Sequence, residues 1–460
     1  MVVEFSSSND ASSSSSSRSE RRPRHSWSEL QRANTARYPR QLVLSQELCL
    51  EATEKNPEPT ELPPPLGCTM GAMGARILVC VLGPGKRYLA ERLCWYLKFF
   101  HGMRCEVFDA NEVSRAEVLA YIDDPDETAA TQLMRSNPAE DDVDRLKMNV
   151  DVGKIAVVVG DGVAWGGTTR EDRERMRVAA HVKLLFVEYV GDKSVETINE
   201  EEEVRYVKIH NYGETVIVRR VRDYQLLLVV KYLAHAHPRK RVVYLTRHGQ
   251  SEYNKLKKIG GNPGLTDLGT AYARWLGESF VRREGIDSTP SRLWTSSMRR
   301  TIETARYLPH PLLELSSGRS WHQMQHRVYR NLDELFAGDY EGMTYDQIMA
   351  ENPDEGGLRK FDKLGYRYPR GESYLDLIAR IDPLITELES YEEPLLVVSH
   401  QATLRVVYAY LTRTLRADAP KIDLPLHTVI KLEWDEGAAS TPAETRYRFS
   451  AAEDDGQQHF

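Results

Sequence analysis

Two histidines that follow apolar segments are the residues of this chain best suited to chemistry. His248, with Arg247 before it and a glycine after it, follows the apolar run Val242–Leu245, and His400 follows the apolar run Leu395–Val398 and a serine. A neutral imidazole attacks phosphorus, an arginine neutralises a phosphate, and a glycine lets the backbone approach a ligand. If both runs are parallel strands of one sheet, both histidines reach the same edge and the same phosphate. The alternative is that both are ordinary residues at strand ends.

Alternating strands and helices predict the sheets that would position such groups. An apolar strand over Ala75–Leu82 precedes a glycine-rich loop and a helix with apolar residues on one face. A strand, a glycine loop and a helix in this order are typical of a phosphate-binding domain built on a parallel sheet. Three further strands are expected in this domain, at Cys105–Phe108, Ile155–Val159 and Val182–Val187.

The motifs around the two histidines resemble the histidine phosphatase superfamily, and within it the bisphosphatase half of the 6-phosphofructo-2-kinase/fructose-2,6-bisphosphatase family. The resemblance is dense over residues 240–435 and looser over residues 74–238, which resemble the kinase half. It implies an α/β protein, in which a P-loop-like parallel-sheet domain precedes a three-layer αβα domain of the phosphoglycerate mutase-like kind. The expected divisions are a disordered Ser/Pro-rich extension over 1–72, the two domains over 73–238 and 239–450, and a tail over 451–460.

The resemblance assigns the chemistry of the phosphatase site to five residues. They are the nucleophile His248, the phosphate-binding Arg247, Arg300 and His400, and the proton donor Glu334. A carboxylic acid beside a phosphate and apolar neighbours has its ionised form disfavoured, as a general acid near neutral pH requires. Asp333 is the rival donor, for which we expect a salt bridge to an arginine instead. The implied reaction is a double displacement through phosphohistidine, without a metal or other cofactor.

Three cationic residues expected to lie away from the nucleophile limit the range of possible substrates. Arg359 and Lys363 are four residues apart, which places them on one face if the segment is helical, and Gly365 is expected to turn the chain before Arg367. Such a set indicates a second anionic group on the substrate, and the resemblance assigns it to the 6-phosphate of a sugar bisphosphate. A solvated basic face is the alternative. Other substrate contacts implied by the resemblance are Asn254, Gly260, Tyr345, Tyr374, Gln401 and Arg405.

The glycine loop of the amino-terminal domain departs from a working phosphate loop. The motif G-x-x-x-x-G-K-[ST] would place its first glycine where Cys80 stands and its magnesium-binding hydroxyl where Arg87 stands. By resemblance, the remnants of a nucleotide site are Gly83, Gly85, Lys86 and Asp161. We therefore expect the kinase chemistry to be lost. Magnesium ATP would be a cofactor only if this loop still binds nucleotide.

The net charge, the lack of long apolar runs and the cysteine content of the sequence indicate the partners and the cellular compartment to expect. A net charge of −7 gives no reason to expect nucleic acid, and the sequence shows neither a signal peptide nor a run that approaches a membrane span. Five cysteines, all in the first quarter and without paired metal spacing, predict free thiols in a reducing cytosol. We expect a cytoplasmic protein, and a homodimer is left open. Ser26 behind three arginines is a candidate phosphorylation site, unless the segment is simply a solvated tail.

The function expected is hydrolysis of fructose 2,6-bisphosphate to fructose 6-phosphate and phosphate. Two alternatives stay open: a bifunctional kinase/phosphatase, and a regulatory protein that binds the bisphosphate or a nucleotide without turnover. The three groups His248, Glu334 and His400 favour turnover over binding alone. A phosphoglycerate mutase shares the histidine core, but the set of Arg359, Lys363 and Arg367 and the upstream α/β domain favour a sugar bisphosphatase.

Overall fold

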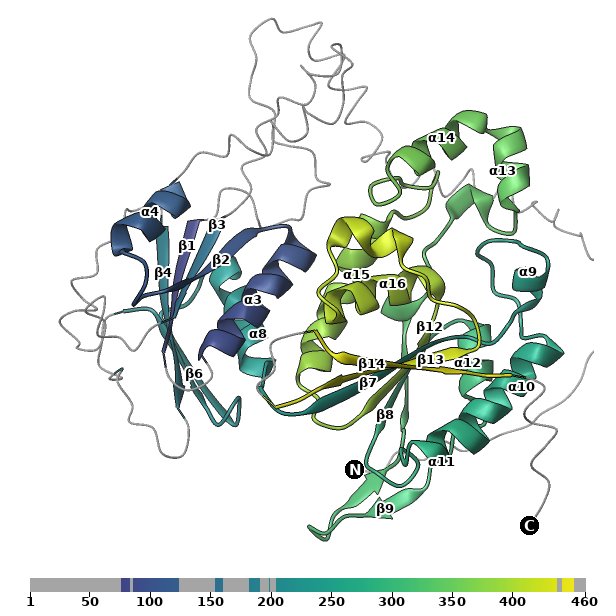
Figure 1. Cartoon of the computed structure of the whole chain (residues 1–460), viewed down its shortest axis with the longest axis horizontal. Helices are drawn as coiled ribbons and strands as arrows, with labels where there is room; N and C mark the ends of the chain where they lie inside the picture. Colours follow the sequence, from purple (N-terminus) through teal and green to yellow (C-terminus); the bar gives the residue numbers. More distant parts are fainter. Residues whose placement is uncertain are drawn as a thin grey trace, which may run out of the picture. The chain divides into compact units, whose positions relative to one another are not determined.

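Among the residues that the structure describes, the chain forms two six-stranded sheets that lie side by side (Figure 1) and one short two-stranded sheet. The computed structural model describes residues 76–82, 86–123, 154–159, 182–190, 198, 204–436 and 441–450. The described residues belong to one compact unit that includes both six-stranded sheets. Within the described ranges, no helix is both long and apolar enough to cross a membrane.

The amino-terminal sheet has the order β2-β3-β1-β4-β5-β6, with all neighbours parallel except β5 and β6. The strand β3 is buried at every position, because helices cover both faces of a parallel sheet. Helices α3 and α8 pack on one face and α4 on the other. The expected parallel α/β domain is therefore confirmed. Its elements are β1 (Arg76–Leu82), α3 (Lys86–His101), β2 (Arg104–Asp109), α4 (Arg115–Asp123), β3 (Lys154–Val159), β4 (Val182–Val190), β5 (Tyr206–His210), β6 (Thr215–Arg219) and α8 (Tyr224–His235).

The second sheet has the order β11-β8-β12-β7-β13-β14 and carries the two histidines. Strands β7 (Arg241–Arg247) and β12 (Leu395–Ser399) are parallel neighbours at its centre, flanked by β8 (Arg292–Ser296) and β11 (His326–Tyr329). The edge beyond β7 is antiparallel, through β13 (Thr428–Trp434) and β14 (Ala443–Arg448).

Helices cover both faces of this sheet and complete the predicted three-layer αβα arrangement. Alternate residues of β7 and β12 point to opposite faces, so Leu245 and Val397 pack in one core cluster while Tyr244 and Val398 pack in another. The helices on the first side are α15 (Tyr374–Glu389) and α16 (Gln401–Leu411), and those on the second are α10 (Asp267–Trp275), η2 (Leu276–Phe280), α11 (Val281–Arg283) and α12 (Arg299–Ala305).

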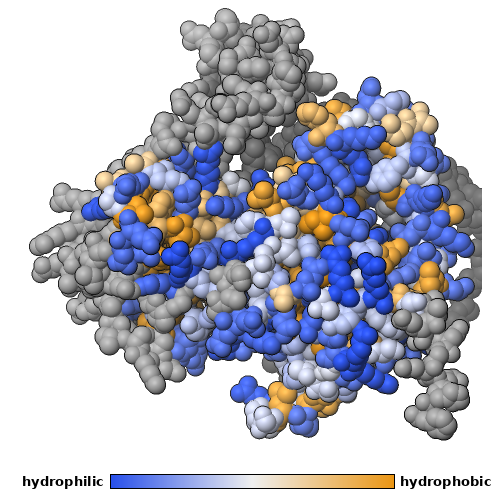
Figure 2. Space-filling view, in the orientation of Figure 1, coloured by the Kyte–Doolittle hydropathy of each residue, from blue (hydrophilic) through white to orange (hydrophobic). Residues whose placement is uncertain are grey.

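Short elements fill the connections of the second sheet. They are α9 (Glu252–Lys255), β9 (Leu312–Glu314), β10 (Ser320–His322), η3 (Arg330–Leu332), η4 (Gly338–Tyr340), α13 (Tyr345–Glu351), α14 (Pro353–Phe361) and η5 (Arg416–Lys421). The face drawn in Figure 2 is largely hydrophilic, with apolar residues over α13 and α14, where Leu358 and Phe361 are 58% and 78% exposed. These two helices are thus more loosely packed than the helices that cover the sheets.

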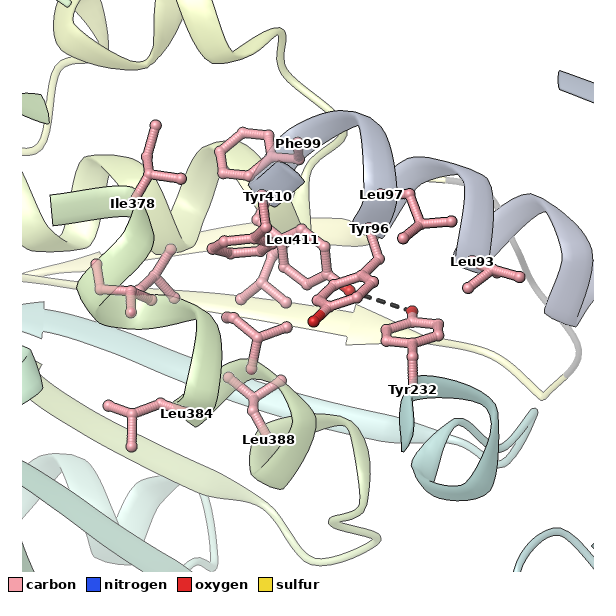
Figure 3. Packing of buried hydrophobic residues seen from close by; sticks show 14 of the residues in the cluster. Leu93, Tyr96, Leu97, Phe99, Tyr232, Ile378, Leu384, Leu388, Tyr410 and Leu411 are labelled. Atoms are coloured by element: carbon pink, nitrogen blue, oxygen red, sulfur yellow. Dashed lines mark hydrogen bonds between the residues drawn. The ribbon is translucent and has the colours of Figure 1, made fainter. Parts of the chain in front are cut away.

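One apolar core joins the two sheets (Figure 3). Tyr96 of α3 stacks on Tyr232 of α8 with ring centroids 4.4 Å apart, and the Tyr232 hydroxyl lies 3.2 Å from the hydroxyl of Tyr410 on α16. A buried ionic group lies in the same interface, where Glu389 at the end of α15 accepts hydrogen bonds from Arg92 of α3 and from Arg241 of β7. Packing is therefore continuous across the expected boundary between residues 238 and 239, which remains a prediction.

The structure corrects the expectation of free thiols. Cys94 of α3 and Cys105 of β2 form a disulfide with Cα atoms 5.2 Å apart, because the chain turns directly from the helix into the strand beside it. Cys80 is free and buried, and burial raises the pKa of its thiol to about 12. The other two, Cys49 and Cys68, lie outside the described residues.

Candidate active site

The two histidines meet at the carboxyl edge of the second sheet. The amide of His248 donates to the carbonyl oxygen of Ser399 at 2.9 Å, which extends the pairing of β7 and β12 by one residue. The imidazole centroids of His248 and His400 lie 5.1 Å apart, and both side chains are buried. Adjacent parallel strands therefore place both rings beside one location, as their positions after apolar runs predicted.

Hydrogen bonding and burial leave the His248 imidazole neutral, with one nitrogen that carries no proton. Its Nδ1 atom lies 2.7 Å from the carbonyl oxygen of Gly249, which only accepts, so Nδ1 carries the proton and Nε2 keeps its lone pair. Burial, with the nearby Arg300 and Arg247, holds the pKa of this imidazole well below its usual range. His248 is thus neutral near pH 7, as attack on phosphorus requires.

Arg247 and Arg300 both lie close enough to His248 to lower the pKa of its imidazole. Arg247 donates Nη1–H to the carbonyl oxygen of Leu424 at 2.9 Å, while its Nε atom is buried without a partner in the described structure. Burial lowers the pKa of Arg247 to about 10, against the opposing effect of Glu334. This Nε–H group is therefore a donor that no described protein group uses.

Arg300 and His400 orient each other. Arg300 donates from Nε to His400 Nδ1 at 3.2 Å and from Nη1 to the carbonyl oxygen of Gly261 at 2.8 Å. Since Nδ1 of His400 accepts, its Nε2 holds the proton and donates to the Ser296 hydroxyl at 2.7 Å. Ser296 was not among the predicted site residues. Its place at the end of β8, next to the sheet edge of the histidines, is the signal that could have found it.

Glu334 faces the cavity, while Asp333 is held away from it. Glu334 accepts hydrogen bonds through Oε1 from its neighbour Leu335 at 2.9 Å and from the amide of Ala402 at 3.1 Å. Asp333 accepts from the amide and hydroxyl of Ser297 at 2.7 and 2.9 Å. The expected salt bridge between Asp333 and an arginine is therefore wrong among the described residues, because Ser297 contacts both carboxylate oxygens instead.

A cavity of about 160 Å³ opens above these groups. Twelve of the fourteen predicted phosphatase residues line it. The two exceptions are His400, which lies fully buried behind Arg300, and Arg367. The lining residues that were predicted are Arg247, His248, Asn254, Gly260, Arg300, Glu334, Tyr345, Arg359, Lys363, Tyr374, Gln401 and Arg405.

The far end of the cavity is cationic. Arg359 donates to the hydroxyls of Tyr368 and Tyr345, both at 2.9 Å, and its guanidinium lies 4.7 Å from the Tyr345 ring centroid. Lys363 donates to the carbonyl oxygen of Pro420 at 2.8 Å, and burial together with Arg405 and Arg359 lowers its pKa to about 8. In the described structure, Arg359 and Lys363 both donate to neutral oxygens. The positive charges of these two side chains are therefore available to an anionic group.

Arg367 lies outside this cationic end. Its guanidinium pairs with Asp376 in the first turn of α15, and its side chain is 59% exposed. The helix α14 also ends at Phe361, so Lys363 enters the cavity from the following loop and not from the helical face that its spacing suggested. Of the three cations that were expected to converge, Arg359 and Lys363 therefore line the cavity and Arg367 does not, while Arg405 lines it as a further cation.

Several lining residues were missed by the sequence reasoning. Ser251 caps α9 by accepting from the amide of Asn254, whose side-chain oxygen in turn accepts from Ser251. Reciprocal capping of this kind is visible in the sequence and fixes the direction of the loop after His248. The missed residues are Ser251, Tyr253, Lys258, Ile259, Leu335, Ala337, Tyr366, Tyr368 and Ala402.

The nucleotide site expected in the amino-terminal domain lies largely beyond the described residues. Gly83, Gly85 and Asp161 fall outside them, and Lys86 is the first residue of α3. Arg87 pairs with Glu91 at 3.2 Å and with Asp109 at 3.5 Å. In the part of the chain that is described, no group of three or more His, Cys, Asp or Glu residues could hold a metal ion.

Known proteins share both halves of this chain. Residues 243–442 match the histidine phosphatase superfamily (branch 1). A 6-phosphofructo-2-kinase/fructose-2,6-bisphosphatase from Gallus gallus is 32% identical over 406 residues, which are 77% of this chain and 81% of that protein. One from Caenorhabditis elegans is 31% identical, over 77% of this chain and 85% of its own. A fructose-2,6-bisphosphatase from Saccharomyces cerevisiae is 38% identical, over 51% of this chain and 48% of its own. The chain therefore belongs to the 6-phosphofructo-2-kinase/fructose-2,6-bisphosphatase family, with a histidine phosphatase domain in its carboxy-terminal half.

Proposed function

We propose that this protein hydrolyses fructose 2,6-bisphosphate to fructose 6-phosphate and phosphate through a phosphohistidine. The observation that carries the proposal is the neutral His248 imidazole between Arg247 and Arg300, with a second cationic end in the same cavity. A single phosphate needs only the first set of charges. The second set, Arg359, Lys363 and Arg405, supports a substrate with two phosphates.

In the first step, Nε2 of His248 attacks the phosphorus of the 2-phosphate. The bond between phosphorus and the sugar oxygen breaks, and Glu334 gives that oxygen its proton, so fructose 6-phosphate leaves. Arg247 and Arg300 stabilise the charge on the transferring phosphoryl group, and they are already oriented by Leu424 and Gly261. Little reorganisation is then needed at the moment of reaction.

In the second step, water attacks the phosphohistidine. The Glu334 carboxylate takes a proton from the water, the bond between nitrogen and phosphorus breaks, and neutral His248 is restored. Free phosphate departs and Glu334 is again a carboxylic acid. Side chains supply every charge in both steps, so the reaction as proposed needs no metal.

The substrate's second phosphate is proposed to bind at Arg359, Lys363 and Arg405. Tyr345 and Tyr368 hold the Arg359 guanidinium by two hydrogen bonds, which fixes its direction before a ligand arrives. Preorganised cations bind an anion at a lower entropic cost than mobile ones do. This end of the cavity would thus distinguish a sugar bisphosphate from a monophosphate.

The test is phosphate release by the purified full-length chain from a panel of phosphorylated sugars and glycerates. The proposal expects fructose 2,6-bisphosphate to have the highest kcat/KM, and radiolabelled 2-phosphate to appear on His248 after a rapid alkaline quench, in which phosphohistidine is stable. Preference for a glycerate phosphate, or turnover without a labelled histidine, would refute it. A chain that binds the bisphosphate without release would instead be the regulatory binder.

A further inference from the structure

One carboxylate outside the cavity connects the two loops that form the catalytic edge. Glu341 accepts the amide of Ala337 through Oε1 at 2.8 Å and the amide of Gly261 through Oε2. Ala337 is three residues after Glu334, and Gly261 follows the cavity residue Gly260. A single side chain therefore ties the proton donor's loop to the loop that closes over the phosphoryl site.

Backbone hydrogen bonds close the same two loops beside this carboxylate. The amide of Gly342 donates to the carbonyl oxygen of Ile259 at 2.8 Å. The amide of Ile259 donates in turn to the carbonyl oxygen of Met343 at 2.9 Å. Gly260 has a φ of +65° and sits directly against the Glu341 carboxylate, where a Cβ atom would overlap its oxygens. The glycine is thus needed for the close approach of this carboxylate as well as for its backbone conformation.

Gly261 connects Glu341 to Arg300, because its amide and its carbonyl oxygen each form one of the two hydrogen bonds. Its amide is held by Glu341, while its carbonyl oxygen accepts from Nη1 of Arg300 at 2.8 Å. Arg300 in turn donates from Nε to His400. Burial of the guanidinium lowers the pKa of Arg300. The carboxylate of Glu341 is one of the nearby negative charges that oppose this effect.

We propose that Glu341 is a positioning residue of the phosphoryl site, which fixes Arg300 through Gly261 and keeps the Glu334 loop in register with it. It is not among the residues that line the cavity, so it acts through these neighbours and not on the substrate. The proposal deepens the proposed function and rests on it for the identity of the reaction. Misplacement of a charge-stabilising group by a fraction of an ångström is expected to lower turnover more than it weakens binding.

The test compares Glu341→Gln with Asp339→Asn in the full-length chain. In Glu341→Gln, one acceptor oxygen is replaced by a side-chain amide NH2 group, which is a donor and would face a backbone N–H group. One of the two contacts, to Gly261 or to Ala337, is therefore lost. Asp339 is an acidic residue of the same turn whose partner is the exposed Arg370, so its variant controls for the loss of a charge. We measure kcat, KM, the affinity for vanadate as a phosphoryl mimic, and the thermal midpoint.

For Glu341→Gln we expect kcat to fall by about 10- to 100-fold and vanadate affinity to fall by about 10-fold, with KM within about threefold. Asp339→Asn should change none of these by more than about twofold. If Glu341→Gln does not fold, Glu341→Asp takes its place, because it keeps the charge but is too short to reach both amides. Unchanged kcat and vanadate affinity, or a loss fully explained by a smaller folded fraction, would overturn the proposal. Vanadate affinity does not depend on the sugar, so this measurement stands even if the wild-type chain rejects fructose 2,6-bisphosphate.

Discussion

The rings of His248 and His400 lie 5.1 Å apart at the ends of neighbouring strands, and both are held neutral by burial and by Arg300. They differ in what their nitrogens contact. Both nitrogens of His400 are engaged, by Arg300 and Ser296, whereas Nε2 of His248 has its lone pair available. His400 is therefore held by a contact at each nitrogen, whereas His248 keeps the atom that we propose as the nucleophile.

Replacing His248 with alanine should abolish both phosphate release and phosphoenzyme labelling. Removal of a nucleophile costs several orders of magnitude in rate, because the remaining groups only stabilise charge. His322→Ala, at an exposed histidine on β10, is the matched control and should keep full activity. Residual activity above a few per cent in His248→Ala would move the reaction centre elsewhere.

Glu334→Gln should slow turnover by roughly 10²- to 10⁴-fold with a modest change in KM, because an amide can hydrogen-bond but cannot deliver a proton. Steady-state kinetics on the bisphosphate checks this. Asp333→Asn is the companion variant, and its effect should be smaller because Asp333 is occupied by Ser297. A larger loss in Asp333→Asn would reassign the proton donor.

The cationic end of the cavity should make substrate affinity depend on pH. The pKa of Lys363 is lowered to about 8, so its ammonium loses its proton at a lower pH than an ordinary lysine does. As the pH rises through about 8, the second phosphate loses one cation and KM for the bisphosphate should rise. In Lys363→Arg the charge persists and this rise should disappear. An identical pH profile in both proteins would show that Lys363 does not contact the substrate.

The buried ionic group between the sheets should contribute to folding stability. Burial alone would raise the pKa of Glu389, but Arg241 and Arg92 hold it at about 2. Arg92→Leu leaves that buried carboxylate short of one partner and should lower the free energy of unfolding by about 3–5 kcal/mol. Arg239→Ala breaks an exposed pair with Glu392 and should cost less than about 1 kcal/mol in the same denaturation experiment. Equal losses would mean that the interface does not form as described.

The amino-terminal domain should not phosphorylate fructose 6-phosphate, even with saturating magnesium ATP. Arg87 stands where a phosphate loop has its magnesium-binding hydroxyl, and it pairs instead with Glu91 and Asp109. Arg87→Thr alone should restore no synthesis of fructose 2,6-bisphosphate, because Cys80 also stands where the phosphate-loop motif has its first glycine. Synthesis by the unmodified chain that is lost in Lys86→Ala would make the protein bifunctional.

Local patterns predicted the elements and most of the cavity. The apolar run expected over Ala75–Leu82 is β1 over Arg76–Leu82, and both histidines follow strands that are neighbours in one sheet. Such predictions depend on residues close in sequence, where strand periodicity and turn chemistry act. Arg367 shows their limit, because its spacing fits a basic cluster but Asp376 competes for it from another element.

The sequence by itself determined the fold class and the family, since these depend on strand patterns and on a few short motifs. The tertiary structure decided which partner each polar or cysteine side chain has, and therefore which charged side chains can still bind a ligand. It pairs Asp333 with Ser297, joins Cys94 to Cys105, and places Glu341 between two loops that are distant in sequence. These outcomes follow from competition among polar groups for partners after burial, and that competition depends on distances that a linear pattern does not contain.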